Sequence, residues 1–141
     1  MSGTENTPIL AYEADIVSFD VLAANIVLGD VVAIDAGNDM AVVTGTAALA
    51  GQAIGVAESC RATSALVGSS TQEEAVIGEK VAVRLKGIVN VEAAADITCG
   101  NQVEANDDGC VISGTDNAKS FGIALSTATT GNLVKVLLRG Y

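Results

Sequence analysis

The sequence predicts an all-β fold, a small β-barrel or sandwich built from two degenerate β-units, with an extended N-terminal arm. Three observations predict it: short apolar segments end at glycines, two of these segments alternate with a period of two, and three blocks recur in one order. The recurring blocks are Ile26–Val32 and Ile97–Val103, Ile54–Ala57 and Phe121–Ala124, and Gly78–Gly87 and Gly131–Gly140. Two copies are fewer than an open solenoid usually needs, so we expect both to pack into one closed core.

The arm is expected to comprise residues 1–19. Its start is polar, and Pro8 favours an extended backbone around it. The remainder of the segment mixes apolar and acidic residues without the spacing of an amphipathic helix. We expect residues 20–141 to form a single β domain, in which the internal duplication spans approximately residues 26–88 and 97–140.

A hairpin is expected near the start of each copy. In both copies two apolar runs are separated by a cluster of Asn, Asp and Gly, the residues that tight turns favour. The predicted strand, turn and returning strand are Val31–Ile34, Asp35–Asp39 and Met40–Thr44 in the first copy, and Gln102–Ala105, Asn106–Gly109 and Cys110–Ser113 in the second.

The third block of each copy is the clearest strand. Apolar residues alternate there with Ala82, Arg84 and Lys86 in the first copy and with Lys135, Leu137 and Arg139 in the second, which is typical of a strand with one face on the core and the other toward solvent or a partner. The alternating apolar residues are Val81, Val83 and Leu85 in the first copy and Val134, Val136 and Leu138 in the second. Residues 58–77 precede the first of these strands. They mix Ser, Thr and Ala, and we expect an exposed loop there, with a short helix as the alternative.

The composition limits what the core and surface can do. Half of the residues are hydrophobic but only 3% are aromatic, so the core must consist of Val, Ile, Leu and Ala. The formal net charge of −10 argues against a nucleic-acid partner, because binding to phosphates needs clustered Lys and Arg. Residues 1–60 contain eight acidic residues and no Lys or Arg. This asymmetry either serves solubility or lets the first segment meet a basic surface.

Neither secretion nor membrane insertion is expected. The first residues are polar and acidic, unlike a secretory signal, and the longest uncharged run, Met40–Ala57, is diluted by Gly, Thr and Gln. The three cysteines, Cys60, Cys99 and Cys110, have no CxxC spacing. We expect them to be small buried thiols of a protein that folds in a reducing compartment.

The sequence does not predict an enzyme, a cofactor or a metal site. It has no His, which excludes Ser-His-Asp and Cys-His catalysis, and it has no phosphate-binding glycine motif. The two acidic turns, Asp35–Asp39 and Asn106–Gly109, offer oxygen atoms that could bind calcium. Neither turn has the ligand spacing of a calcium-binding loop, so plain hairpin turns are the favoured interpretation.

The basic residues concentrate on the two matching third-block strands. Five of the seven lie there, namely Lys80, Arg84, Lys86, Lys135 and Arg139. One interpretation is protection of an edge strand against unwanted pairing. The other is a basic stripe that meets an acidic surface on a neighbouring subunit. Both interpretations place this face of the strands outside the core.

Several of these segments together resemble a known protein family. Gly29–Val32, Ile54–Ala57 and Val81–Val91 resemble segments of the small capsid decoration proteins of tailed double-stranded DNA phages, also called cement or head-stabilising proteins. Ile123–Ala124 and Val134–Leu138 extend the resemblance, which covers roughly residues 12–140. The chain departs from the family pattern in its first 20 residues and in the 58–77 connection.

The resemblance implies a non-enzymatic, β-rich structural protein of the virion. Such proteins are often homotrimers that bind the capsid exterior at gaps between hexamers of the major capsid protein, stabilising the head against internal DNA pressure. The expected partners are therefore the major capsid protein and other copies of this chain, with synthesis in the host cytoplasm. The alternatives are a tail, fibre-associated or cell-surface β-module, and a small-molecule-binding barrel, which the scarcity of aromatic residues disfavours.

The residues expected to bind partners belong to the arm and to the basic stripe. The arm cannot form a core alone, but it can lie across a neighbour as an added strand. Its acidic residues would then meet bases of the capsid protein or of an adjacent subunit. The candidate residues are Ile9, Leu10, Tyr12, Glu13, Asp15 and Ile16 in the arm, and Arg84, Lys86, Lys135 and Arg139 in the stripe.

Overall fold

The computed structural model describes residues 15–60 and 74–139, and it confirms the all-β fold. Two short 3-10 helices, η2 (Ala47–Gln52) and η4 (Asp107–Gly109), interrupt the strands of this described part. The strands are β1 (Ile16–Val21), β2 (Ile26–Val27), β3 (Val31–Ile34), β4 (Ala41–Thr44), β5 (Ala53–Cys60), β6 (Glu74–Ala75), β7 (Lys80–Arg84), β8 (Gly87–Glu92), β9 (Gln102–Ala105), β10 (Val111–Ser113), β11 (Gly122–Ala124) and β12 (Leu133–Leu138).

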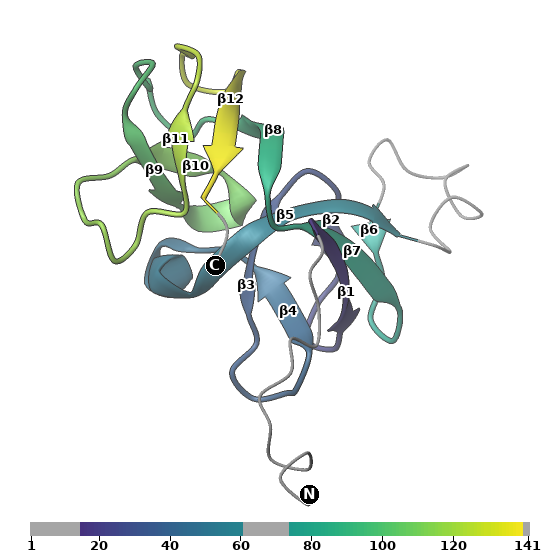
Figure 1. Ribbon diagram of the computed structural model, residues 1–141. Coiled ribbons are helices and arrows are strands. Elements are labelled where there is room, and N and C mark those ends of the chain that lie inside the picture. The colour runs from purple at the N-terminus through teal and green to yellow at the C-terminus, as the bar shows by residue number, and fades with distance from the viewer. Residues whose placement is uncertain (1–14, 61–73, 140–141) are drawn as a thin grey trace, which may run out of the picture.

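The strands form two units that follow one another along the chain (Figure 1). In the first unit, β1, β4, β3, β5 and β7 form a closed barrel in that order, and β2 pairs with β6 beside it. In the second unit the order is β10, β9, β11, β12 and β8. Its two edge strands, β8 and β10, meet at one parallel bridge, Ala93↔Val111. The equivalent pair in the first unit is Val21↔Val42, where β1 and β4 pair in parallel.

The strand pairs of the two units have the same register. Each valine at the start of the hairpin lies opposite the glycine of the second block, and each alanine of the second block lies opposite a valine of the third. The matching Cα pairs are Val32↔Gly55 and Val103↔Gly122, and Ala57↔Val83 and Ala124↔Val136. The order of the blocks along the chain therefore corresponds to an order of strands in space.

The units begin earlier than the repeated blocks suggested. β1 pairs with β7 as β8 pairs with β12, so β1 is the counterpart of β8. Ile16–Phe19, which we expected in the arm, form most of β1, and the expected limit between residues 19 and 20 falls inside this strand. The expected start of the first copy at residue 26 is likewise about one strand too late.

Corner glycines hold the same conformation in both units. Gly29 and Gly100 have φ values of 97° and 93°, in the left-handed region that L-residues with a side chain rarely adopt. Their N–H groups donate to the carbonyls of Ala57 and Ala124, both at 2.8 Å. Each glycine thus turns the chain just before the hairpin, and its hydrogen bond joins this corner to the last residue of the second block.

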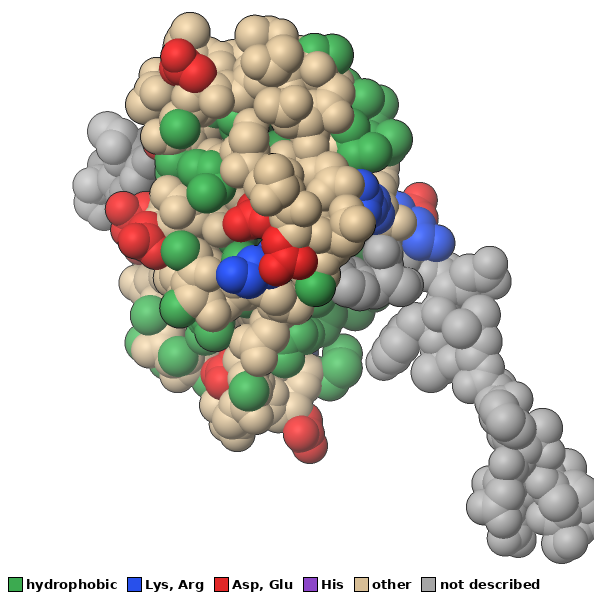
Figure 2. Space-filling view, turned by 90° about the vertical axis from the view of Figure 1, so that its left-hand side faces the viewer, with side chains coloured by type: hydrophobic (Ala, Val, Ile, Leu, Met, Phe, Trp, Pro, Cys, Tyr) green, Lys and Arg blue, Asp and Glu red, His purple; other side chains and the backbone are tan. Residues whose placement is uncertain are grey.

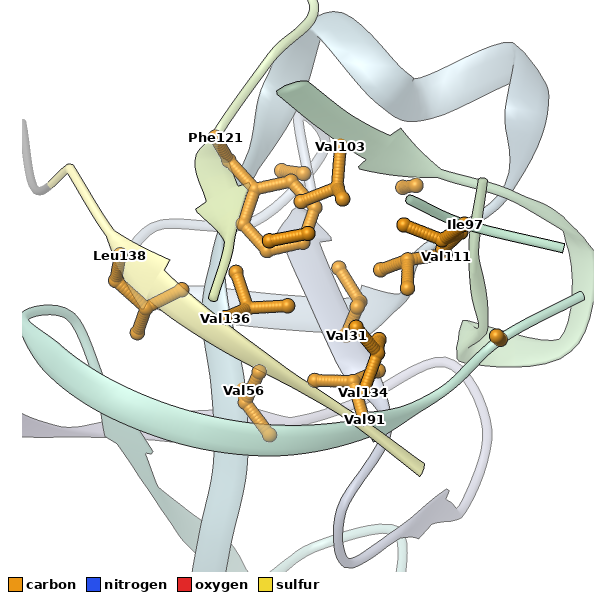
Figure 3. Packing of buried hydrophobic residues seen from close by; sticks show 14 of the residues in the cluster. Val31, Val56, Val91, Ile97, Val103, Val111, Phe121, Val134, Val136 and Leu138 are labelled. Atoms are coloured by element: carbon orange, nitrogen blue, oxygen red, sulfur yellow. The ribbon is translucent and has the colours of Figure 1, made fainter. Parts of the chain in front are cut away.

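The two units share a core built almost entirely from aliphatic side chains (Figure 3). Val31 of β3 and Val56 of β5 belong to the first barrel, yet they lie in one buried cluster with Val103, Phe121 and Val136 of the second unit. A second cluster, which includes Phe19, Val21 and Val83, fills the first barrel. Because the larger cluster draws on both units, they pack as one body.

Some expectations for the connecting segments and cysteines need correction. Residues 58–60 and 74–75 belong to β5 and β6 rather than to a loop, and 61–73 lie outside the described residues. The expectation of buried thiols is wrong: Cys99 is exposed, and Cys60 and Cys110 are half-buried. Cys99 precedes the corner glycine Gly100, and that corner lies at the surface. In the part of the chain described here, no helix is long and apolar enough to span a membrane.

Candidate functional site

The predicted arm residues are only partly within the described structure. Ile9, Leu10, Tyr12 and Glu13 lie outside it. Asp15 is exposed, and its carbonyl accepts a hydrogen bond from the Leu85 N–H at 2.7 Å. Ile16 is 39% exposed and lies opposite Arg84 in the β1–β7 pair. The described chain therefore begins beside the end of β7, next to the predicted basic stripe.

Two members of the basic stripe are already paired within the subunit. The Arg84 Nε lies 2.7 Å from the Glu58 Oε1, and the Lys80 Nζ lies 2.6 Å from the Asp20 Oδ1. Arg84 also donates through Nη1 to the Lys86 carbonyl at 3.3 Å. These pairs are at least partly solvated, so each contributes about 1 kcal/mol or less to stability. Their charges are largely satisfied by the chain's own carboxylates.

The remaining members of the stripe are exposed. Lys86, Lys135 and Arg139 have no ion pair with any carboxylate of the described residues. The Lys135 Nζ donates to the side-chain oxygen of Asn90 at 3.4 Å. The structure thus separates the predicted stripe into two ion-paired members on β7 and three members without an ion pair in the described residues: Lys86 after β7, Lys135 within β12 and Arg139 after β12.

Apolar side chains reach the surface on the same strands, a feature that sequence reasoning missed. The outward-facing residues of β12 and its neighbours form what we call the β12 face. They are Ile88, Ile123, Leu125, Leu133, Lys135, Leu137 and Arg139. Figure 2 shows that hydrophobic side chains are also exposed on the side of the molecule that it presents, and that basic side chains there lie close to acidic ones. The alternation in β12 could have revealed this face, because Leu133 and Leu137 stand at its outward positions.

A hollow with an acidic lining lies where the two units meet. It measures about 510 Å³ and is lined by Val27, Asp30, Thr44, Thr46, Glu92, Asp108 and Cys110. Burial, and then the nearby carboxylates of Glu92 and Asp108, raise the pKa of Asp30 from 3.8 to about 6. The turn after β9 approaches closely here, since a Cβ on Gly109 would lie 2.5 Å from the Asp30 side chain.

Cys110 lines the same hollow. Its Sγ lies 3.3 Å from the Glu92 Oε2. Burial, the hydrogen bond to Glu92 and the surrounding carboxylates together raise the pKa of the Cys110 thiol to about 12. The thiol therefore stays protonated at neutral pH and is a poor nucleophile.

The two acidic turns use their carboxylates to hold the backbone. The Asp35 side chain accepts from the Gly37 N–H and from the Asn38 side-chain amide, both at 3.0 Å. Asp107 accepts from the Ala47 N–H at 3.2 Å, which ties the second turn to the first unit. Within the described residues no group of three His, Cys, Asp or Glu side chains is arranged to hold a metal ion. Asp35 thus stabilises its own turn, whereas Asp107 fixes the second turn against the first unit.

A second hollow, of about 550 Å³, opens between β5, β7 and the start of β8. Leu28, Val56 and Ile88 supply apolar walls, and the Arg84–Glu58 pair supplies the charged one. The acid and the base in this lining are therefore paired with each other.

The comparisons with known proteins agree with a role in assembly. A family model described as phage cement protein matches residues 6–140. The chain belongs to this family. As a phage cement protein it is a virion-associated structural protein that stabilises the capsid, to which it binds. The match spans both units and the whole of the segment that the sequence analysis related to capsid decoration proteins.

A solved structure is similar to the cement protein in fold. It is the crystal structure of the head fiber gp8.5 N base in bacteriophage phi29. The match has a TM-score of 0.55 and 19% sequence identity, and it covers 87% of this chain and 93% of that chain. At this identity the likeness shows the fold alone. No curated protein matches the chain.

Proposed function

We propose that this cement protein binds the exterior of the capsid lattice, contacts the major capsid protein, and holds the head together against the pressure of packaged DNA. The observation that carries the proposal is the family match over residues 6–140. The described surface supports it, because it offers exposed apolar and basic positions for contact. On this proposal the chain is made in the host cytoplasm and carries out no catalysis.

The arm provides one attachment point in this proposal. Residues 1–14 include Ile9, Leu10 and Tyr12 together with acidic Glu13, a composition suited to an added strand with acidic flanks. The first barrel is closed, whereas the edge strands β8 and β10 of the second unit meet at a single bridge. An arm that adds as a strand therefore needs an open edge on the capsid protein or on a neighbouring copy.

The unpaired bases provide a second attachment point. Lys86, Lys135 and Arg139 are exposed and can meet the acids of an arm or of the capsid, and Asp15 and Ile16 lie where the arm joins the barrel. Arg84 contributes less than we first expected, because Glu58 neutralises it. Individual ion pairs at such a rim contribute weakly, so the apolar residues carry most of the affinity. The family resemblance favours a homotrimer as the unit that binds.

Deletion of the arm tests this attachment. The deletion should end at residue 14, because removing residues 1–19 would cut away most of β1 and open the barrel. We expect the shortened protein to keep its melting temperature and to bind capsids at least tenfold more weakly in a co-sedimentation assay. A charge control, Glu5→Gln with Glu13→Gln, and a series in high salt should weaken binding less than the deletion does. Equal binding by the shortened and full chains would refute the role of the arm.

A further inference from the structure

We propose that two surfaces that lie apart on the molecule join one copy of the protein to the next: the β12 face, and the tip of the hairpin between β3 and β4. The hairpin tip comprises Ile34, Asp35, Asp39 and Met40. The proposal names the contact through which copies associate. It therefore rests on the proposed self-association and not on binding to the capsid.

The β12 face contains an apolar row that crosses three strands. Ile123 of β11, Leu137 of β12 and Ile88 of β8 are direct cross-strand neighbours. Leu137 is 41% exposed and Ile88 is 60% exposed. Neighbouring Leu125 and Leu133, at 40% and 65%, extend the row into a patch. A group of exposed apolar side chains of this kind is typical of a surface that another molecule covers.

The first unit has different side chains at the same positions, where it packs in part against the second unit, since Val56 is only 4% exposed and belongs to the shared core. The cross-strand row that corresponds to Ile123, Leu137 and Ile88 is Val56, Arg84 and Ile16. Glu58 follows Ala57 there as Leu125 follows Ala124 in the second unit, and it forms the ion pair with Arg84. One unit therefore has a charged pair where the other has two exposed leucines, although the backbone pairing is the same.

The charges around the β12 face select an acidic partner. Lys135 and Arg139 stand on either side of Leu137 along the outward side of β12. Two such faces placed against each other would bring like charges together, which disfavours a symmetric contact between them. Asp35 and Asp39 at the hairpin tip of a second copy offer the opposite charge, and residues 34–40 contain no Lys or Arg.

The hairpin tip has the chemistry that the β12 face needs. Ile34 and Met40 are 38% and 48% exposed, and exposed Asp39 precedes Met40. The tip therefore presents two apolar side chains next to an acid, whereas the β12 face presents an apolar row next to two bases. Asp35 fixes the turn through its bonds to Gly37 and Asn38, so the tip is already ordered for contact.

Met40 adds an independent indication that the tip is functional. Its φ of 52° lies in the left-handed region, where a residue with a side chain is strained. Val42 and Val111 occupy matching positions in the two hairpins. The residue two positions before Val111 is Gly109, which therefore corresponds to Met40 and has a φ of 75°. The Asp20 N–H donates to the Met40 carbonyl at 2.7 Å and holds this conformation. The fold alone would favour glycine at position 40.

The two surfaces cannot meet within one chain. Figure 1 shows the turn between β3 and β4 at the lower end of the first unit, and β8 and β12 in the upper half of the molecule. A contact between them must therefore join different copies, with the second unit of one copy against the first unit of the next. Such head-to-tail contacts build a closed ring when the rotation between copies permits it.

Two variants test the contact, and the internal repeat indicates that both should fold. The first, Leu125→Glu with Leu137→Arg, places on the β12 face the charged pair that the first unit carries at the same positions. The second, Ile34→Thr with Met40→Gly, removes the apolar tip and introduces the glycine that the second unit has. Circular dichroism and thermal unfolding serve as folding controls, and Leu22→Ser, an exposed leucine outside both surfaces, is the matched control.

Sedimentation velocity of the full chain gives the decisive readout. We expect the wild type and Leu22→Ser to associate, and each of the two variants to associate at least tenfold more weakly. An equimolar mixture of the variants should form a heterodimer, because it retains one intact face and one intact tip. Association of either variant at the wild-type level, a monomeric wild type, or a mixture that stays monomeric would overturn the proposal. Capsid co-sedimentation of the same samples reports separately on the proposed function.

Discussion

Asp30 offers a quantitative test of how the two units meet. It sits at the corner after Gly29, faces Glu92 and Asp108 across the acidic hollow, and is half-buried. Its raised pKa means that the folded protein binds the proton more tightly than the unfolded chain does. The stabilisation from protonation is fully present below about pH 4 and is lost as the pH rises through about 6. At neutral pH the charged carboxylate therefore destabilises the fold.

The magnitude follows from the pKa. A rise from 3.8 to about 6 corresponds to at most about 3 kcal/mol at neutral pH. Because Asp30 is half-exposed, solvent screens the neighbouring charges, and about 1–2 kcal/mol is the expected effect. Asp30→Asn removes the charge and keeps the shape. Asn101 occupies the same corner of the second unit, and both corners make the same backbone hydrogen bonds.

Urea unfolding between pH 3.5 and 8 measures this effect. We expect Asp30→Asn to raise the free energy of unfolding at pH 7.5 and to have little effect near pH 3.5, where the wild-type carboxyl is protonated. Asp39→Asn, at the hairpin tip and away from the hollow, is the control and should show no such change. A variant that is less stable than the wild type at pH 7.5, or a difference that does not depend on pH, would refute the reasoning.

Two further predictions concern the glycines of β5 and β11 and the acidic turns. Gly55→Ala and Gly122→Ala should each lower the free energy of unfolding by about 2 kcal/mol or more, because a Cβ would collide with the Arg84 or Leu137 carbonyl. Gly51→Ala, with open space around its Cβ, should be neutral in the same urea titration, and equal effects at all three positions would contradict the packing argument. Adding a chelator should leave the melting temperature unchanged in differential scanning calorimetry, since the turn carboxylates hold backbone groups; a clear drop would instead indicate a bound cation.

The repeated blocks could be predicted from the sequence because their glycines have geometric roles. Gly29 and Gly100 need a left-handed backbone, and Gly55 and Gly122 lie where another strand passes too close for a side chain. Such positions tolerate few substitutions, so they stay visible when the rest of the repeat has diverged. The hairpins and the alternating third-block strands could also be predicted, because their patterns lie within a few consecutive residues.

β1 was missed although its signal was present. Ile16-Val17-Ser18-Phe19-Asp20-Val21 aligns with Ile88-Val89-Asn90-Val91-Glu92-Ala93, and the two segments pair identically with β7 and β12. The mixture of polar and apolar residues suggested an arm when each segment was considered alone. Comparing it with the segment that follows the third block would have assigned it to a strand.

The surfaces could not be predicted in the same way because they depend on long-range register. The acidic hollow joins Asp30, Glu92 and Asp108 from three distant segments. Arg84 forms its ion pair with Glu58 where the register between β5 and β7 shifts, between Ala57 and Ser59. No pattern in the sequence predicts that irregularity. The basic stripe was therefore predicted as a continuous surface, although part of it is neutralised.

The most direct test of the central claim is to add the purified protein to capsids that lack it and to measure the temperature at which they release DNA. The account predicts saturable binding at a fixed ratio to the major capsid protein and a higher release temperature at saturation. Capsids that bind none of the folded protein, or that bind it without any change in release temperature, would contradict a capsid-stabilising role.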